Sequence, residues 1–193
     1  MNRRNLLLSL GVLAMGGPFS LALAAPAPMN EQQFWKIVGE VRDESALRVD
    51  ARTAILERHL MALEPQAIQS FQIRYEGLLL EANRWNLWGA AYLMNGGCSD
   101  DGFKYFRDWL ISEGEHIYRA AVKNPDSLAS VARRDYFELE SFGYAALRAY
   151  AANGAGELDR DFKVEFAVPA GKEWIESELP MLLPILAAKY PSN

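Results

Sequence analysis

The strongest constraint on the fold is a series of apolar stripes at helical spacing in the first half of the chain. Apolar residues three or four positions apart lie on one face of an α-helix, and that face must be buried. Three such helices follow one another, the second over residues 47–63, and together they predict a helical bundle. Their apolar faces consist of Phe34, Ile37, Val38 and Val41, then Val49, Leu56, Leu60 and Leu63, and then Ile68, Phe71, Tyr75, Leu78, Leu79 and Ala82.

Residues that typically begin helices precede these stripes. Asn30, with Gln33 three positions later, has the reciprocal capping pattern, and Pro65 suits the first turn of the third helix. Ser112 with Glu115 repeats the capping pattern farther along the chain. These residues predict where three helices begin.

Residues 85–94 are nearly all apolar, which predicts a helix buried on most of its sides. The two glycines at 96–97 should end this helix, because glycine readily adopts the left-handed conformation. Ser99 is suited to cap the next helix. Asp100 and Asp101 then fall in its first turn, where the helix dipole favours negative charge.

The second half of the chain is less regular. One more helix, with an apolar stripe from 139 to 149, should end at residues 153–154. Helical periodicity is then lost, and residues 164–168 fit either a short edge strand or an extended loop. Two prolines divide residues 179–190 into two short helical turns. The sequence therefore predicts a mainly α, single-domain bundle of about seven or eight helices over residues 30–190.

The N-terminal residues 1–24 have the form of a secretory signal peptide. Arg3 and Arg4 precede an apolar stretch over residues 6–23, and small residues follow it. We predict cleavage after Ala24, because alanines at the last and third-last positions fit the small residues that signal peptidase requires. The mature chain would then be periplasmic or secreted.

Three further predictions concern this region. The arginine pair resembles the twin-arginine export signal, with the general secretory route as the alternative. Glycines and a proline interrupt the apolar stretch, so we predict no permanent membrane anchor, and residues 25–29 should form a short tether. A translation start at Met29 is an alternative that would leave a cytoplasmic protein of the same fold.

Charge and cysteine content limit the possible functions. The chain has a formal charge of −5, and the predicted signal holds two arginines and no acid, so the mature chain would carry −7. Such an acidic chain is a poor candidate for binding nucleic acid or anionic lipid through bulk electrostatics. The single cysteine, Cys98, allows no internal disulfide, so stability must come from packing.

The densest group of chemically interesting residues lies between the apolar helix and the one that follows it. A thiol beside two carboxylates at a helix N-terminus could bind a cation or act as a nucleophile, because the helix end lowers the pKa of a nearby thiol. The same residues are also explained by capping and packing, with Arg107 pairing with one of the aspartates. The candidate binding surface comprises Trp85, Trp88, Tyr92, Cys98, Ser99, Asp100, Asp101, Arg107 and Trp109.

Other catalytic patterns are missing from the sequence. His59 and His116, the two histidines, lie in different predicted helices, and we predict no metal site. We find no Gly-x-Ser-x-Gly elbow and no glycine pattern that cradles phosphates, so no cofactor is predicted.

The central segment closely resembles the bacterial DUF4240 family, a domain of unknown function. The resemblance covers residues 29–128, is looser at 136–144, and implies no activity or catalytic residue. Its motifs are NRWNLWGAAY at 83–92, GGCSDDGF at 96–103, FR at 106–107 and WL at 109–110, with an opening helix at 30–35 and a later segment at 124–128.

The favoured hypothesis is a non-enzymatic binding or interaction module of the bacterial cell envelope, with a protein or small molecule as partner. It rests on the lack of a complete catalytic set. The alternative is a hydrolase or metal-dependent enzyme that uses Cys98, Asp100 and Asp101.

Overall fold

The computed structural model describes residues 26–191 with the exception of residue 47. This part of the chain is mainly helical and contains no β-strand, which confirms the predicted mainly α fold. The α-helices are α1 (Glu31–Glu44), α2 (Arg52–Met61), α3 (Pro65–Glu81), α4 (Trp85–Asn95), α5 (Asp100–Ser112), α6 (Glu115–Lys123), α7 (Ala145–Ala152), α8 (Lys163–Phe166), α9 (Leu179–Leu182) and α10 (Pro184–Lys189). Short 3-10 helices span Val49–Ala51, Pro125–Ser130, Glu140–Tyr144 and Glu176–Glu178.

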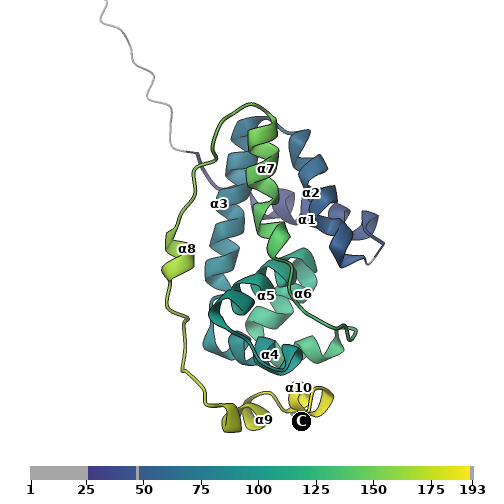
Figure 1. Ribbon diagram of the computed structural model, residues 1–193, viewed down its shortest axis with the longest axis vertical. Coiled ribbons are helices and arrows are strands. Elements are labelled where there is room, and N and C mark those ends of the chain that lie inside the picture. Colours follow the sequence, from purple (N-terminus) through teal and green to yellow (C-terminus); the bar gives the residue numbers. More distant parts are fainter. Residues whose placement is uncertain (1–25, 47, 192–193) are drawn as a thin grey trace, which may run out of the picture.

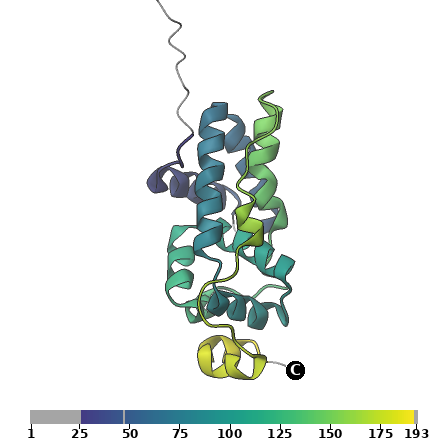
Figure 2. The same cartoon turned by 90° about the vertical axis from the view of Figure 1, so that its left-hand side faces the viewer.

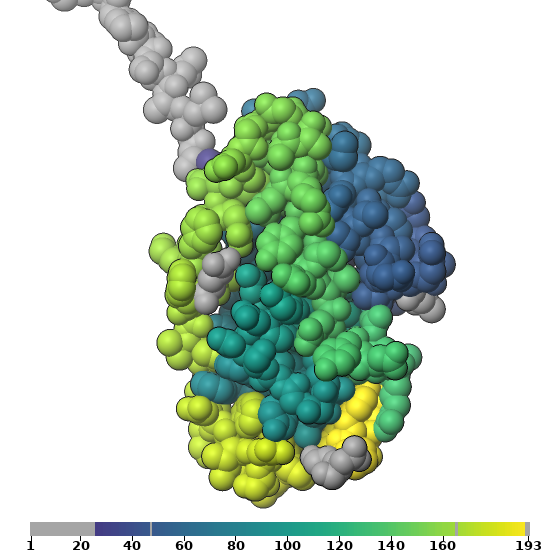
Figure 3. All heavy atoms as spheres, viewed as in Figure 1, coloured from purple at the N-terminus to yellow at the C-terminus, as the bar shows by residue number. Residues whose placement is uncertain are grey.

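The helices form an elongated molecule with two halves. In one half, α1 and α2 pack beside the long helix α3 and the antiparallel α7, and in the other half α4, α5 and α6 cross below them (Figure 1). The C-terminal segment, residues 153–191, descends along α3, carries α8, and ends with α9 and α10 beneath α4 (Figures 1 and 2). In the space-filling view it forms a band along one side and across the base of the molecule (Figure 3). The first and last helices of the chain therefore lie far apart.

Most of the expected helix ends are present. The Asn30 side chain accepts a hydrogen bond from the Gln33 backbone N–H at 2.8 Å, and Pro65 is the first residue of α3. Ser99 accepts from the Gly102 N–H at 3.1 Å and so caps α5. Gly96 ends α4 in the left-handed conformation, with φ of 69°. Local capping chemistry therefore sets these boundaries.

Two expected helix starts are wrong. The second helix begins at Arg52 rather than at residue 47, after a 3-10 turn, and Arg52 is buried with its guanidinium bonded to Ser112 and Glu113. Ser112 does not cap α6. It is the last residue of α5, and its hydroxyl donates to the Trp109 carbonyl at 2.7 Å, while Gly114 with φ of 91° makes the turn.

The extended segment expected at residues 164–168 is instead mostly helical. Residues Lys163–Phe166 form α8, because the Asp161 carboxylate accepts a hydrogen bond from the Lys163 N–H at 3.0 Å and starts a helical turn. The stripe from 139 to 149 is also divided, into the 3-10 turn Glu140–Tyr144 followed by α7. The two short helices at the end of the chain, α9 and α10, occur as expected.

The predicted signal peptide and its cleavage at Ala24 lie outside the described residues. Within the described part, no helix has the length and apolar character needed to cross a membrane. The predicted tether ends earlier than expected, because Met29 belongs to the folded domain. Its side chain is buried, its N–H donates to the Ser70 carbonyl at 2.8 Å, and its carbonyl accepts from Arg74 at 2.7 Å.

The C-terminal segment is attached to α4 by specific contacts. Trp85 donates its N–H to the Ala170 carbonyl at 3.0 Å, and the Trp174 indole N–H donates to the Trp85 carbonyl at 2.7 Å. Gly89 allows the close approach, since a methyl group there would lie 2.8 Å from a Leu179 methyl carbon. The Asp126 carboxylate accepts two backbone N–H groups at the start of α10. These contacts hold the segment against the N-terminal half of α4 and against the 3-10 turn Pro125–Ser130.

Candidate functional site

Two aromatic rings of the predicted surface, Trp85 and Trp88, form a face-to-face stack with Phe103 of α5. Trp85 and Trp88 have ring centroids 5.1 Å apart with 5° between their planes, and Trp88 and Phe103 are 5.0 Å apart at 8°. The Trp88 indole N–H donates to the Cys98 carbonyl at 3.0 Å. The stack thereby joins α4, the loop after it and α5 into one unit.

The polar residues of the loop have separate local roles. Ser99 caps α5, and Asp100 and Asp101 are exposed in its first turn. Burial, followed by the charge of Glu138, raises the pKa of the Cys98 thiol to about 12. A nucleophilic cysteine requires the opposite shift. Among residues 26–191 other than 47, no group of three or more His, Cys, Asp or Glu side chains is arranged to hold a metal ion.

Two of the nine proposed surface residues lie in the interior. Trp109 is fully buried, with its ring 5.1 Å from Phe106 and 5.0 Å from Phe137. Arg107 does not pair with either loop aspartate as expected. Its guanidinium donates to the Leu79 carbonyl at 2.9 Å and lies 4.8 Å from the centre of the Phe103 ring. Both residues therefore hold α5 against its neighbours.

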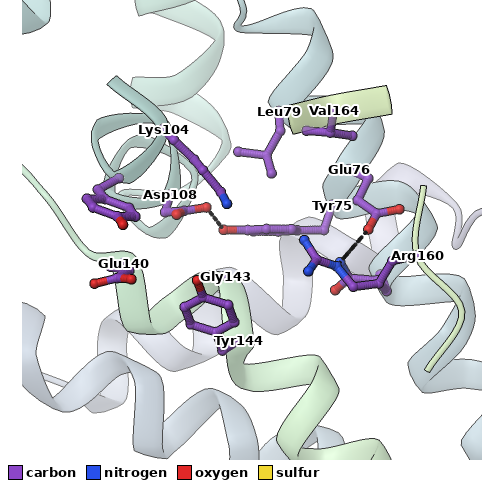
Figure 4. A pocket seen from close by; sticks show the side chains of 12 residues that line it. Tyr75, Glu76, Leu79, Lys104, Asp108, Glu140, Gly143, Tyr144, Arg160 and Val164 are labelled. Atoms are coloured by element: carbon purple, nitrogen blue, oxygen red, sulfur yellow. Dashed lines mark hydrogen bonds and ion pairs between the residues drawn. The ribbon is translucent and has the colours of Figure 1, made fainter. Parts of the chain in front are cut away.

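Sequence reasoning missed a buried acid on α5. The Tyr75 hydroxyl donates to Asp108 at 2.5 Å, and both side chains are inaccessible (Figure 4). Burial raises the pKa of Asp108 to about 7, although the Tyr75 hydrogen bond and the nearby positive charges of Arg107 and Lys104 act in the opposite direction. The available signal was the charged pair Arg107 and Asp108 inside the run FRDWLI, at 106–111, whose other residues are apolar.

The pocket at this acid is small. Its volume is about 20 Å³, which is close to the space that one water molecule needs. Gly143 closes one side, since a methyl group there would lie 3.1 Å from an Asp108 oxygen. Lys104, Tyr144 and Arg160 also line the pocket (Figure 4). A substrate larger than water therefore cannot reach the carboxyl group in this conformation.

A larger cleft lies where the C-terminal segment meets α4 and the end of α6. Its volume is about 430 Å³, within the range of small-molecule sites. One wall comes from Arg84 and Asn86 at the start of α4 and from residues 123–125 at and just after the end of α6. The other wall comes from residues 170–174 and from the end of the chain around α9. The residues near α9 are Glu178, Leu179, Leu182 and Leu183.

The first wall of the cleft is rich in hydrogen-bond donors. Arg84 uses its Nε to donate to the Glu81 carbonyl at 3.0 Å, and Lys123 is exposed. Asn86 and Asn124 are exposed, and the Asn124 side-chain oxygen accepts a hydrogen bond from the Asp126 N–H at 3.3 Å. The opposite wall contributes the apolar side chains of Trp174, Leu179, Leu182 and Leu183.

None of the nine proposed surface residues lines this cleft. Two of them contact Trp174, which does line the cleft. The Trp85 carbonyl accepts the Trp174 indole N–H, and the Tyr92 ring makes an edge-on contact with the Trp174 ring at 5.2 Å. Trp85 and Tyr92 therefore hold Trp174 in the cleft wall without lining the cleft themselves.

The sequence model of one protein family, described as a protein of unknown function (DUF4240), matches residues 29–152. The chain belongs to the DUF4240 family. No curated protein and no solved structure matches it. The family match covers the donor-rich wall of the cleft and stops before the C-terminal segment, which supplies the apolar wall.

Proposed function

We propose that this DUF4240 protein is a non-enzymatic module of the bacterial cell envelope that binds a small molecule in the cleft beside α4. The observation that carries the proposal is the cleft itself. Its volume of about 430 Å³ and its combination of apolar and polar walls are typical of small-molecule sites.

The titratable groups support binding rather than catalysis. The raised pKa of the Cys98 thiol keeps it protonated near neutral pH, so the hydrolase alternative loses its nucleophile. Asp108 has a pKa suited to proton transfer, but its pocket has room only for about one water molecule. Neither group faces the cleft.

We expect the protein, purified from its own host without denaturation, to carry a small molecule that native mass spectrometry detects as an added mass. Ala170→Trp should abolish this adduct, because Ala170 is an exposed residue of the cleft wall and an indole there would fill the cleft. Ala188→Trp is the matched control. Ala188 is an exposed residue of α10 outside the cleft, so the adduct should persist.

Two results would contradict the proposed function. One is a protein recovered with no adduct that also shows no change in melting temperature with any member of a metabolite panel. The other is an adduct that Ala170→Trp and Ala188→Trp leave equally intact, because it would be bound elsewhere.

We also propose that the protein is exported, on the basis of residues 1–24. Edman sequencing or mass spectrometry of the native protein is expected to find Ala25 at the N-terminus. Blocking signal peptidase should instead retain the full chain. A native chain that begins at Met29 would contradict export and support the cytoplasmic alternative.

A further inference from the structure

We propose that the cleft selects a small organic anion with an apolar body, an inference that rests on the proposed function and names its class of ligand. The cleft separates two kinds of chemistry. Cationic and amide donors line the wall formed by α4 and the end of α6, and apolar side chains line the wall formed by the C-terminal segment.

No carboxylate of the described residues forms an ion pair with the two cations of the donor wall. Lys123 forms no hydrogen bond or ion pair with any described residue, and Arg84 uses only its Nε, in a bond to a backbone carbonyl. Glu81, the acid nearest to Arg84 in sequence, is bound by Arg119 at 2.8 Å. Within the part of the chain that the structure describes, the positive charges of Arg84 and Lys123 therefore face the cleft without a fixed counter-ion.

The acids of the cleft lie on the opposite wall. Glu178 is 3.8 Å from Lys172, so this pair contributes little net charge. Glu173 is exposed and is the remaining acid of the cleft. With the paired residues set aside, two positive charges face one negative charge, in a chain whose overall charge is −5. The local excess of positive charge on the donor wall therefore favours an anionic group there.

The apolar wall is suited to the rest of the ligand. Trp174 is held in place because its indole N–H is bonded to Trp85 and its ring contacts Tyr92. Leu179 and Leu183 are buried against α4, whereas Leu182 is 52% exposed at the cleft. A ligand that covered Leu182 would remove its apolar surface from water, which stabilises the complex. A wholly polar ion such as sulfate would leave the apolar side chains of this wall exposed to water.

Three probes with the same alkyl chain test the inference: octanoate, 1-octanol and octylammonium. Isothermal titration calorimetry gives their dissociation constants, and the indole N–H signal of Trp174 in NMR spectra reports whether the cleft is occupied. We expect octanoate to bind about ten-fold more tightly than 1-octanol, because it adds charge-assisted hydrogen bonds. Octylammonium should bind more weakly than either.

Replacing the two cations of the donor wall tests their part in binding. Arg84→Gln and Lys123→Gln should each weaken octanoate binding about three-fold, the effect of a solvent-exposed charge pair, and the double variant should remove its advantage over 1-octanol. Binding of 1-octanol should not change. Lys36→Gln is the control, because Lys36 is an exposed lysine of α1 outside the cleft.

The outcomes separate the two proposals. Cleft binding of 1-octanol or octylammonium at least as tight as that of octanoate would overturn the anion assignment and leave the binding function intact. The same holds if octanoate binding is insensitive to both cation variants. Failure of all three probes to shift the Trp174 signal would overturn the anion assignment, whereas a native adduct that Ala170→Trp removes would still support the binding function.

Discussion

The free energy of unfolding is expected to fall by up to about 4 kcal/mol as the pH rises from about 4 to about 8, owing to Asp108 alone. In the unfolded chain this carboxyl ionises near its ordinary pKa of 3.8, whereas burial raises its pKa in the folded protein to about 7. At pH values between 3.8 and about 7, the Asp108 carboxyl is therefore ionised in the unfolded chain and protonated in the folded protein. Rising pH therefore favours unfolding until the folded carboxyl also ionises.

Asp108→Asn should remove most of this pH dependence and make the protein more stable than the wild type at pH 8. The amide oxygen can still accept the Tyr75 hydroxyl, while the charge can no longer form. Urea unfolding of both proteins across this pH range measures the effect. Asp101→Asn is the matched control, because Asp101 is an exposed aspartate of the same helix. Parallel pH profiles for wild type and Asp108→Asn would show that the buried carboxyl does not have the raised pKa.

Trp109→Ala is expected to destabilise the protein by about 3–5 kcal/mol, although the sequence suggested that Trp109 belongs to a surface. The side chain is fully buried between Phe106 and Phe137, so its removal loses apolar contact and leaves a cavity. Chemical unfolding followed by circular dichroism would measure the loss. A large loss is consistent with a residue at the centre of the core.

Two companion variants sharpen this test. Trp109→Phe should cost much less than Trp109→Ala, because it keeps an aromatic ring and removes a buried indole N–H that has no hydrogen-bond partner among the described residues. Trp85→Ala should also cost less, since Trp85 is only half-buried. Equal, small losses for Trp109→Ala and Trp85→Ala would place Trp109 at the surface and contradict its position in the core.

The division of the cleft between two parts of the chain bears on the DUF4240 family as a whole. The donor-rich wall lies within the matched residues 29–152, and the apolar wall lies beyond them. If the anion inference holds, the family domain supplies the recognition of charge. The C-terminal segment, which supplies the apolar wall, would then determine which apolar group the anionic ligand carries.

The sequence by itself determined the helical class and several helix boundaries. Asn30, Pro65, Gly96 and Ser99 act within one turn of their own positions, so their effect is visible in the local sequence. The apolar stripes likewise predicted which faces are buried, because helical periodicity alone sets them. The prediction at Ser112 was wrong because its hydroxyl bonds backward within α5.

Tertiary structure decided the candidate site. The Tyr75 and Asp108 pair joins residues 33 positions apart, and Trp174 bonds to Trp85 from 89 positions away. The cleft exists only because α9 and α10 dock beneath α4, where Gly89 permits the approach and Asp126 caps α10. Such contacts depend on which helices meet in space, and local propensity does not encode that choice.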